Sequence, residues 1–258
     1  MKRRDFIQAS VAAVAATSAC SVASAAPAAG ARQVYEWRTY KLADAAHQSR
    51  VSDYLKSAAV PTWQRLGLGP IGVFTELGPE ATSAIHVLIT YPDAAAVATA
   101  REALEADAQY KQAAASYLAS KKEDPAFEQI DSWLLLAFAG APQITPPAMK
   151  PRVLEVRTYK NHGEDRARAK VDMFNDGEID IFPKCGFENV WFGEALAGTG
   201  LPCLKYMLGA PDMAANEAGW KTFIAHPDFV KMRDDPKYAD TQPEISKLFL
   251  APTDFSQV

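Results

Sequence analysis

The sequence lacks the short motifs that bring a nucleophile, a metal ion or a phosphate into an active site. Only three cysteines and four histidines occur in 258 residues, and no two histidines stand four positions apart. There is no Cys-x-x-Cys pair, no glycine-rich phosphate loop and no Gly-x-Ser-x-Gly elbow. These absences argue against a zinc site, a phosphate-binding loop and a serine-hydrolase elbow, and we predict no metal site.

Basic clusters and long apolar runs are also missing. The formal net charge is −4, and the lysines and arginines form no dense run outside the N-terminus. Nucleic acids and anionic membrane surfaces are bound through such basic patches, so neither is an expected partner. No stretch approaches the roughly 20 apolar residues that a membrane span needs, so the mature form is expected to have no transmembrane segment.

The first 25 residues have the charged, apolar and small-residue order of a secretory signal. Arg3 and Arg4 precede an apolar pair and an Ala/Val-rich run, and Ala25 ends a small-residue cleavage site. The paired arginines resemble the twin-arginine pattern, which predicts export of the folded protein to the periplasm. A lipoprotein anchored through Cys20 is the alternative interpretation.

The rest of the chain is an internal repeat. Tyr35–Lys41 (Tyr-Glu-Trp-Arg-Thr-Tyr-Lys) returns as Leu154–Lys160 (Leu-Glu-Val-Arg-Thr-Tyr-Lys), 119 positions later. The same offset aligns the pairs Trp63/Phe182, Gly67/Gly186, Pro92/Pro211 and Asp93/Asp212. We therefore expect one domain at 33–138 and a second at 153–252, joined by a Pro-rich linker at 139–152.

Each copy has the same predicted order of elements. In the first copy, strands are expected at 35–42, 71–77, 85–91 and 130–138, and helices at 44–66 and 92–121. In the second copy, strands are expected at 153–160, 188–195, 203–210 and 245–250, and helices at 165–184 and 214–233. Strand–helix–strand–strand–helix–strand is the order of the ferredoxin-like fold, so the fold class is α+β.

Specific residues of both copies resemble the NIPSNAP family of the dimeric α/β-barrel superfamily. The resemblance rests on the repeated Glu-x-Arg-Thr-Tyr strand, the hairpin after it, and Trp220, Phe223 and the run His226–Phe229. The first copy departs from the pattern, with Arg101 where the second has Trp220. The resemblance implies two tandem ferredoxin-like domains that pack as an intrachain dimeric α/β barrel. The biochemical role of the family is poorly defined, so the resemblance says little about mechanism.

The first strand of each copy carries the candidate binding site. Because side chains alternate along a strand, its Glu, Arg and Tyr share one face. We expect this polar face to point into the barrel interior, with a glutamate added from each adjacent hairpin strand. The candidate residues are Glu36, Arg38, Tyr40, Glu155, Arg157, Tyr159, Glu76 and Glu194. Two interpretations stay open: structural ion pairs, or a pocket in which arginine and tyrosine bind an anionic or carbonyl-bearing ligand.

No cofactor is predicted. Because some barrels of this superfamily bind haem through one histidine, haem held by His86 or His226 is the alternative. The tryptophans, Trp220 among them, are expected in the core. Cys185 and Cys203 fall too far apart in the predicted hairpin for a disulfide, so both are expected to be free.

Three functions remain after these observations. The first is an exported protein that binds a small, partly apolar ligand with a polar or anionic end. The second is a cofactor-free monooxygenase or isomerase, and the third is a structural or assembly protein with a filled barrel. The expected partners are a small-molecule ligand and, through further homo-oligomerisation, other copies of the chain.

Overall fold

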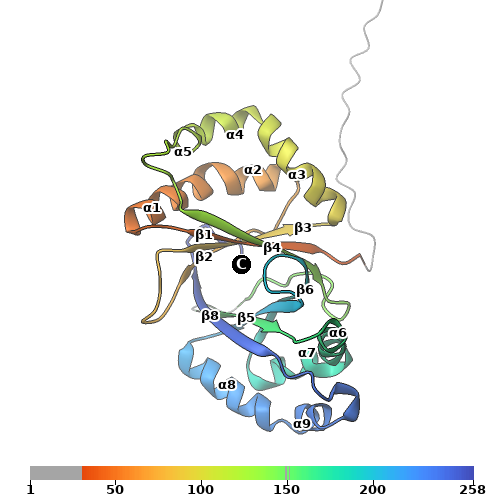
Figure 1. Ribbon diagram of the computed structural model, residues 1–258. Coiled ribbons are helices and arrows are strands. Elements are labelled where there is room, and N and C mark those ends of the chain that lie inside the picture. The colour runs from red at the N-terminus through yellow and green to blue at the C-terminus, as the bar shows by residue number, and fades with distance from the viewer. Residues whose placement is uncertain (1–30, 149, 151) are drawn as a thin grey trace, which may run out of the picture.

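Two layers of helices enclose a β-barrel in this computed structural model, which describes residues 31–148, 150 and 152–258 (Figure 1). The predicted signal peptide lies outside the described residues. One group of helices (α1–α5) covers one side of the barrel, and the other group (α6–α9) covers the opposite side.

Eight antiparallel strands close the barrel in the order β1-β3-β2-β8-β5-β7-β6-β4. Their bounds are β1 Val34–Lys41, β2 Gly72–Glu76, β3 Ile85–Tyr91, β4 Gln129–Ala137, β5 Val153–Lys160, β6 Glu188–Ala197, β7 Cys203–Ala210 and β8 Glu244–Pro252. Each half supplies four consecutive strands of the chain. The halves join at β2–β8 and β4–β6, so the expected intrachain α/β barrel is confirmed.

The helices begin close to where the sequence predicts them. They are α1 Ala45–Tyr54, α2 Val60–Arg65, α3 Ala94–Ala106, α4 Ala108–Ala113, α5 Ala115–Leu118, α6 Glu164–Met173, α7 Ile179–Ile181, α8 Met213–Ala225 and α9 Pro227–Arg233, with short 3-10 turns η3 Pro183–Cys185 and η4 Pro236–Tyr238. Asp44, Asp93 and Asp212 each accept backbone N–H bonds as N-caps.

The repeat extends to irregular details of the backbone. The π-helical turns η1 (Leu55–Ala59) and η2 (Phe174–Glu178) lie 119 positions apart. Gly67 and Gly186 both have positive φ, at 77° and 90°, which ends the helical segment in the same way in each half. Matching irregularities at matching positions show that the two halves share one backbone plan.

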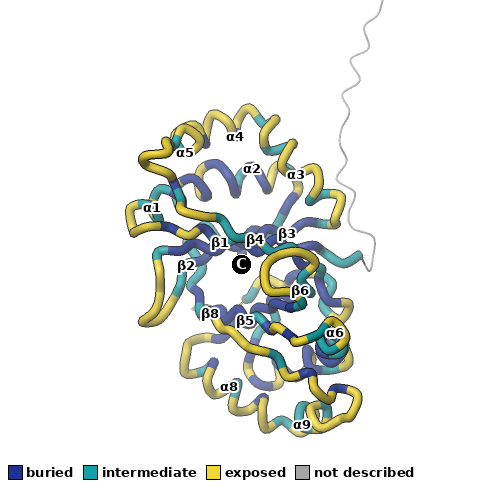
Figure 2. Tube along the Cα trace, in the orientation of Figure 1, coloured by how far each residue is buried: buried dark blue, intermediate teal, exposed yellow. Residues whose placement is uncertain are grey.

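The barrel interior is filled by apolar side chains from the strands of both halves. This interior cluster includes Tyr35, Trp37, Phe74, Leu135, Leu154, Val156, Trp191, Met207 and Leu250. The linker adds Ile144, whose backbone N–H donates to Gln33 Oε1, and the last residue, Val258, is also buried here. Figure 2 shows the barrel strands mostly buried and the helices exposed on their outer faces.

The expected orientation of the first strands is therefore wrong. Tyr35 and Trp37, and likewise Leu154 and Val156, point into the barrel, while the Glu, Arg and Tyr side chains lie between the sheets and their helices. The physical reason is the supply of polar partners. The barrel interior offers mainly apolar neighbours from the facing sheet, whereas polar partners for the two glutamates lie on the helix side: Asn216 and Trp220 of α8 for Glu155, and Tyr91 and Ser132 of the neighbouring strands for Glu36.

Two further findings bear on the predictions. Cys185 and Cys203 are both buried and free, as expected from the hairpin register. Among the described residues, no helix is both long enough and apolar enough to cross a membrane.

Candidate functional site

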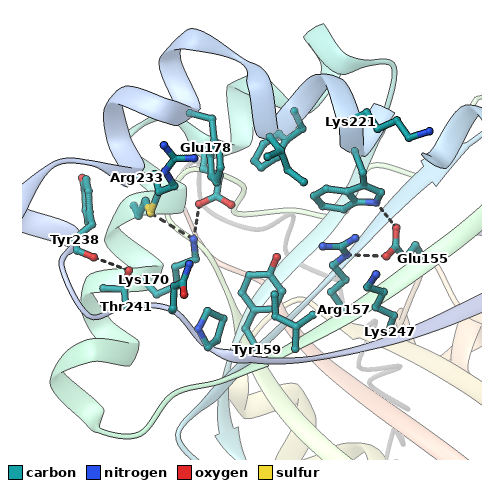
Figure 3. A pocket seen from close by; sticks show the side chains of 18 of the residues that line it. Glu155, Arg157, Tyr159, Lys170, Glu178, Lys221, Arg233, Tyr238, Thr241 and Lys247 are labelled. Carbon is teal, nitrogen blue, oxygen red and sulfur yellow. Dashed lines mark hydrogen bonds and ion pairs between the residues drawn. The ribbon is translucent and has the colours of Figure 1, made fainter. Parts of the chain in front are cut away.

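The second half contains a cavity of about 1150 Å³ between its sheet and its helices. Strands β5 and β8 form one side, and α6, α8 and α9 form the other, with the segment 238–243 at the edge (Figure 3). All three second-half residues of the predicted trio, Glu155, Arg157 and Tyr159, line it. The structure thus places the trio at a cavity, although on the helix side of the sheet.

Glu155 is fully occupied by protein donors. Its Oε1 accepts from Arg157 Nε at 2.7 Å. Its Oε2 accepts from Asn216 Nδ2 at 2.8 Å and from Trp220 Nε1 at 2.6 Å, both on α8. A buried carboxyl group that accepts from three donors holds those donors in place, so Glu155 positions Arg157 and Trp220.

Arg157 presents unused donors to the cavity. Its guanidinium carbon lies 3.3 Å from the centre of the Trp220 ring, which covers one face of the group. Only Nε has a hydrogen-bond partner among the described residues, so Nη1 and Nη2 remain available. The residue is 8% exposed, and the pairing with Glu155 and stacking on Trp220 leave little freedom to move.

Tyr159 adds a hydroxyl group beside Arg157. The buried Tyr206 hydroxyl donates to the Tyr159 hydroxyl at 2.8 Å. Burial raises the pKa of Tyr206 well above its ordinary value, so this phenol stays protonated and keeps donating. Tyr159 then has its own hydrogen to donate, and no acceptor for it occurs among the described residues.

A buried ion pair lies further along the same cavity. Lys170 Nζ donates to Glu178 Oε2 at 2.9 Å and contacts the sulfur of Met173 at 3.4 Å. Both charged side chains are almost fully buried. Figure 3 shows this pair on the opposite side of Tyr159 from Arg157. The two charges of this pair neutralise each other, so the buried cation with free nitrogens at the strand face is Arg157.

The remaining lining combines apolar walls with exposed cations. Phe223, Ile224 and Phe229 contribute apolar surface from α8 and α9. Lys221 and Lys247 are exposed members of the lining, and Lys247 stands directly opposite Arg157 on β8. The cavity therefore combines buried donors, apolar walls and positive charge near solvent.

The first half has a cavity of about 1140 Å³ at the equivalent place. Glu36, Arg38 and Tyr40 line it, as their counterparts line the other cavity. Here Arg101 replaces Trp220, and its side chain is 87% exposed. The two trios thus occupy separate cavities, and the helix residues around them differ between the halves.

Glu76 and Glu194 belong to neither cavity. Glu76 Oε1 lies 2.9 Å from His86 Nε2, and His86 Nδ1 lies 3.0 Å from the Thr39 hydroxyl. The hydrogen bond with His86 holds the pKa of Glu76 down at about 2. Glu194 instead pairs with Arg168 of α6 on the helix side.

A β-bulge explains why these two glutamates diverge. One extra residue at Val190 shifts β6 relative to β7, so Gly193 pairs with Lys205 as Phe74 pairs with His86. The similar sequences Phe-Thr-Glu and Phe-Gly-Glu are therefore out of register by one, and a shift of one residue exchanges the faces of a strand.

The histidines proposed as haem ligands have other contacts. Both ring nitrogens of His86 have protein partners, as described above, and Trp37 stacks against its ring. His226 Nδ1 accepts from the Asp228 N–H at the start of α9. Neither histidine lines the two cavities. Within residues 31–148, 150 and 152–258, no cluster of three His, Cys, Asp or Glu side chains is arranged to hold a metal ion.

The helices contribute site residues that were not predicted from the sequence. Lys170 and Glu178 stand where the first half has Val51 and Ala59, and this exchange of apolar for charged residues was a usable signal. Trp220 packs against the second-half core as expected, and it also lines the cavity and donates to Glu155, which was not predicted. Asn216 corresponds to Val97, another polar gain confined to the second half.

Comparison with known families gives matches in both halves. The family model described as NIPSNAP matches residues 35–139 and 154–257. No curated protein matches the chain.

Two solved structures share the barrel fold at low sequence identity. A "Putative monooxygenase" from Fusobacterium nucleatum is 10% identical, with 86% of this chain and 93% of that chain covered and a TM-score of 0.57. A "putative monooxygenase" from Lactobacillus acidophilus is 10% identical, covers 86% and 94%, and has a TM-score of 0.55. A NIPSNAP-like domain protein from Burkholderia xenovorans is 18% identical over 42% of this chain and 90% of that chain, with a TM-score of 0.37. At these identities the likeness extends to the fold alone.

Proposed function

This chain belongs to the NIPSNAP family, and we propose that its second half binds a small, partly apolar organic anion in the cavity between the sheet and the helices. The anionic end, a carboxylate for example, is held by Arg157 and Tyr159. The apolar body lies along Phe223, Ile224 and Phe229.

The observation that carries this proposal is the buried Arg157 with two uncommitted nitrogens at the cavity. A guanidinium presents its N–H groups in a planar fork that matches the geometry of a carboxylate. Glu155 and Trp220 fix the group before a ligand arrives, so little side-chain entropy is lost on binding. Lys221 and Lys247 favour the approach of an anion from solvent.

The same contacts favour binding over proton abstraction. A general base needs an oxygen or nitrogen free to accept a proton from the substrate. Glu155 already accepts three hydrogen bonds, and Glu178 accepts from Lys170. Arg157 has no acceptor atom, and Tyr159 in its protonated state has a hydrogen to donate.

Calorimetric titration with 1-naphthoate tests the proposal, with methyl 1-naphthoate as the uncharged counterpart. We expect the acid to bind at least about tenfold more tightly than the ester, because a charge-assisted hydrogen bond contributes about 1.5–3 kcal/mol. Tyr159→Phe removes one donor and should weaken naphthoate binding about fivefold. Arg157→Lys keeps the charge beside Glu155 but loses the planar fork, and should weaken binding about tenfold or more.

The matched control is Tyr40→Phe, the same substitution at the equivalent position of the first half. It should leave the affinity for naphthoate unchanged. Equal affinities for acid and ester, or equal losses in Tyr159→Phe and Tyr40→Phe, would contradict the proposal.

A further inference from the structure

The first-half cavity is similar in size to the second but is lined by different chemistry. Residues of β1, β3 and β4 face α1–α5 across it, together with the segment 120–127. Five of the chain's nine tyrosines line this cavity: Tyr40, Tyr54, Tyr91, Tyr110 and Tyr117. Trp63 and Phe127 add two more aromatic rings.

More of the guanidinium nitrogens have protein partners in Arg38 than in Arg157 of the other half. Its Nε and Nη2 both contact Glu36 Oε1, at 2.8 and 2.7 Å. Its Nη1 donates to the Tyr40 hydroxyl at 3.3 Å. All three nitrogens thus have protein partners, so the guanidinium does not offer an uncommitted fork to a carboxylate.

Tyr40 and the Tyr54–Tyr110 pair keep hydroxyl hydrogens that a ligand can accept. Tyr40 is 1% exposed, accepts from Arg38, and has no acceptor for its own hydrogen among the described residues. The hydroxyls of Tyr54 and Tyr110 lie 3.1 Å apart, so one donates to the other and the second keeps its hydrogen. Burial raises the pKa of Tyr40 and Tyr54, which keeps both phenols protonated. A buried donor without an acceptor costs free energy that a bound acceptor would recover.

Stacked aromatic side chains give this cavity flat apolar walls, which favour a flat ligand. Tyr54 and Tyr117 stack with centroids 3.6 Å apart and planes within 5°. Tyr117 also lies 6.3 Å from Phe127, with the two rings inclined by 28°. Planar rings pack well against such surfaces and interact with their quadrupoles in offset stacking.

The buried charges of this cavity, Arg38 and Glu36, pair with each other, and the other charged side chains lie on the solvent side. Arg101 is paired with Glu105, and Lys111, Lys121 and Lys122 are exposed. Exposed lysines are screened by salt and contribute little to the binding of a buried group. The deep part of the cavity therefore selects a neutral hydrogen-bond acceptor.

From these contacts we propose that the first half is a second binding site, specific for a neutral planar aromatic molecule that carries a hydroxyl or carbonyl oxygen. The oxygen accepts from the Tyr40 hydroxyl and from the Tyr54–Tyr110 pair. The ring lies against the aromatic walls. This site does not depend on the anion site of the second half.

Calorimetry with 1-naphthol tests this second site directly. We expect one naphthol per chain, with an affinity that Tyr40→Phe lowers about tenfold and Tyr54→Phe lowers by a similar factor. Tyr159→Phe, the matched variant of the second half, should leave naphthol binding unchanged. Saturating naphthoate should not displace naphthol, because the two ligands occupy different cavities. Far-ultraviolet circular dichroism and melting temperature establish that each variant is folded.

Three results would overturn the inference: no binding of naphthol, an unchanged affinity in both Tyr40→Phe and Tyr54→Phe, or displacement of naphthol by naphthoate. The result that naphthoate fails to bind while naphthol binds as expected would reject the anion site and leave this one intact. The two proposals therefore fail separately.

Discussion

The two halves share one sheet plan and differ in the helices that cover it. Both first strands place Glu, Arg and Tyr beneath the helices, at positions 119 residues apart. In the second half, Trp220 and Asn216 of α8 hold the carboxylate from above, and Arg157 keeps free nitrogens. In the first half, Tyr91 and Ser132 of the neighbouring strands hold Glu36 instead.

This difference identifies the part of the fold that distinguishes the two proposed sites. The sheet-borne trio supplies the same three groups in both halves, yet their availability depends on residues elsewhere. Charged partners in the second half, Lys170 and Glu178, correspond to Val51 and Ala59 in the first. Helix residues, and the segments that follow them, therefore distinguish the proposed anion site from the proposed phenol-lined site.

The largest expected effect comes from giving the second half one apolar residue of the first. Lys170→Val introduces the residue that the first half has at Val51, and it removes the partner of the buried Glu178 carboxylate. We expect a loss of about 3–5 kcal/mol in the free energy of unfolding, because an unpaired buried charge remains. Urea denaturation at pH 7 measures it.

The matched double variant provides the control. Lys170→Val with Glu178→Ala reproduces both residues of the first half and removes both charges. It should recover most of the lost stability, since replacing a whole buried pair by apolar groups is often close to neutral. A double variant less stable than the single one would contradict this account of the pair.

The two halves also differ at His86 and Lys205, which occupy equivalent positions on β3 and β7. His86 has a carboxylate partner in Glu76, whereas Lys205 donates to the Thr158 hydroxyl at 2.7 Å and lies 4.0 Å from the Trp133 ring centre. Burial lowers the pKa of Lys205 from 10.5 to about 8. The folded state thus opposes the charge of this lysine.

Lys205→Met should therefore stabilise the protein at pH 7, by up to about 3 kcal/mol. Between pH 8 and 10.5 the unfolded chain binds more protons at this lysine than the folded chain, so the wild type gains stability as pH rises. The advantage of Lys205→Met should shrink over the same interval. Urea denaturation of both proteins, at pH 7 and across this interval, measures the difference in their free energies of unfolding. A difference that does not change with pH would show that Lys205 is not buried as a charge.

A smaller effect is expected from Trp220→Phe. Phenylalanine keeps an aromatic ring over Arg157 but cannot donate to Glu155 Oε2. We expect a loss of about 1–2 kcal/mol, the scale for removing one donor from a buried charged group. Denaturation with urea measures it, and Arg101→Phe at the equivalent exposed position serves as the control, with a smaller change expected.

The smallest effect is expected from Arg101→Ala. Arg101 pairs with Glu105 one helical turn away, and both side chains are mostly exposed. Such pairs contribute little because water and salt screen them. The melting temperature should match that of the wild type within error, and a clear decrease would show that Arg101 has a structural role equivalent to that of Trp220.

Local sequence signals predicted much of the fold. The alternation of side chains across a strand identified the first strand of each half. Asp44 and Asp93 marked where the two helical segments of the first half begin, because a side-chain carboxylate satisfies free N–H groups there. The repeat predicted two equal halves, since so many residues match at one offset. These features depend on neighbours in the sequence or on the repeat itself.

The candidate site was predicted only in part. Alternation correctly groups Glu36 with Arg38 and Tyr40, but it does not state which side of the sheet receives that group. Tyr35 and Trp37 suit a helix-covered face as well as a barrel interior, so hydrophobicity alone led to the wrong side. The bulge at Val190 and the approach of Trp220 to Arg157 depend on tertiary contacts that no local pattern records.

The linker between the halves has a consequence for how the protein can evolve. It joins both halves in one chain, and hydrogen bonds of Ile144 and Pro142 with Gln33 hold it against the barrel. In a barrel built from two identical chains, every substitution appears on both sides at once. Here Trp220 can arise without altering Arg101, and Lys170 without altering Val51. Covalent linkage thus frees each half to acquire its own selectivity while the shared barrel stays unchanged.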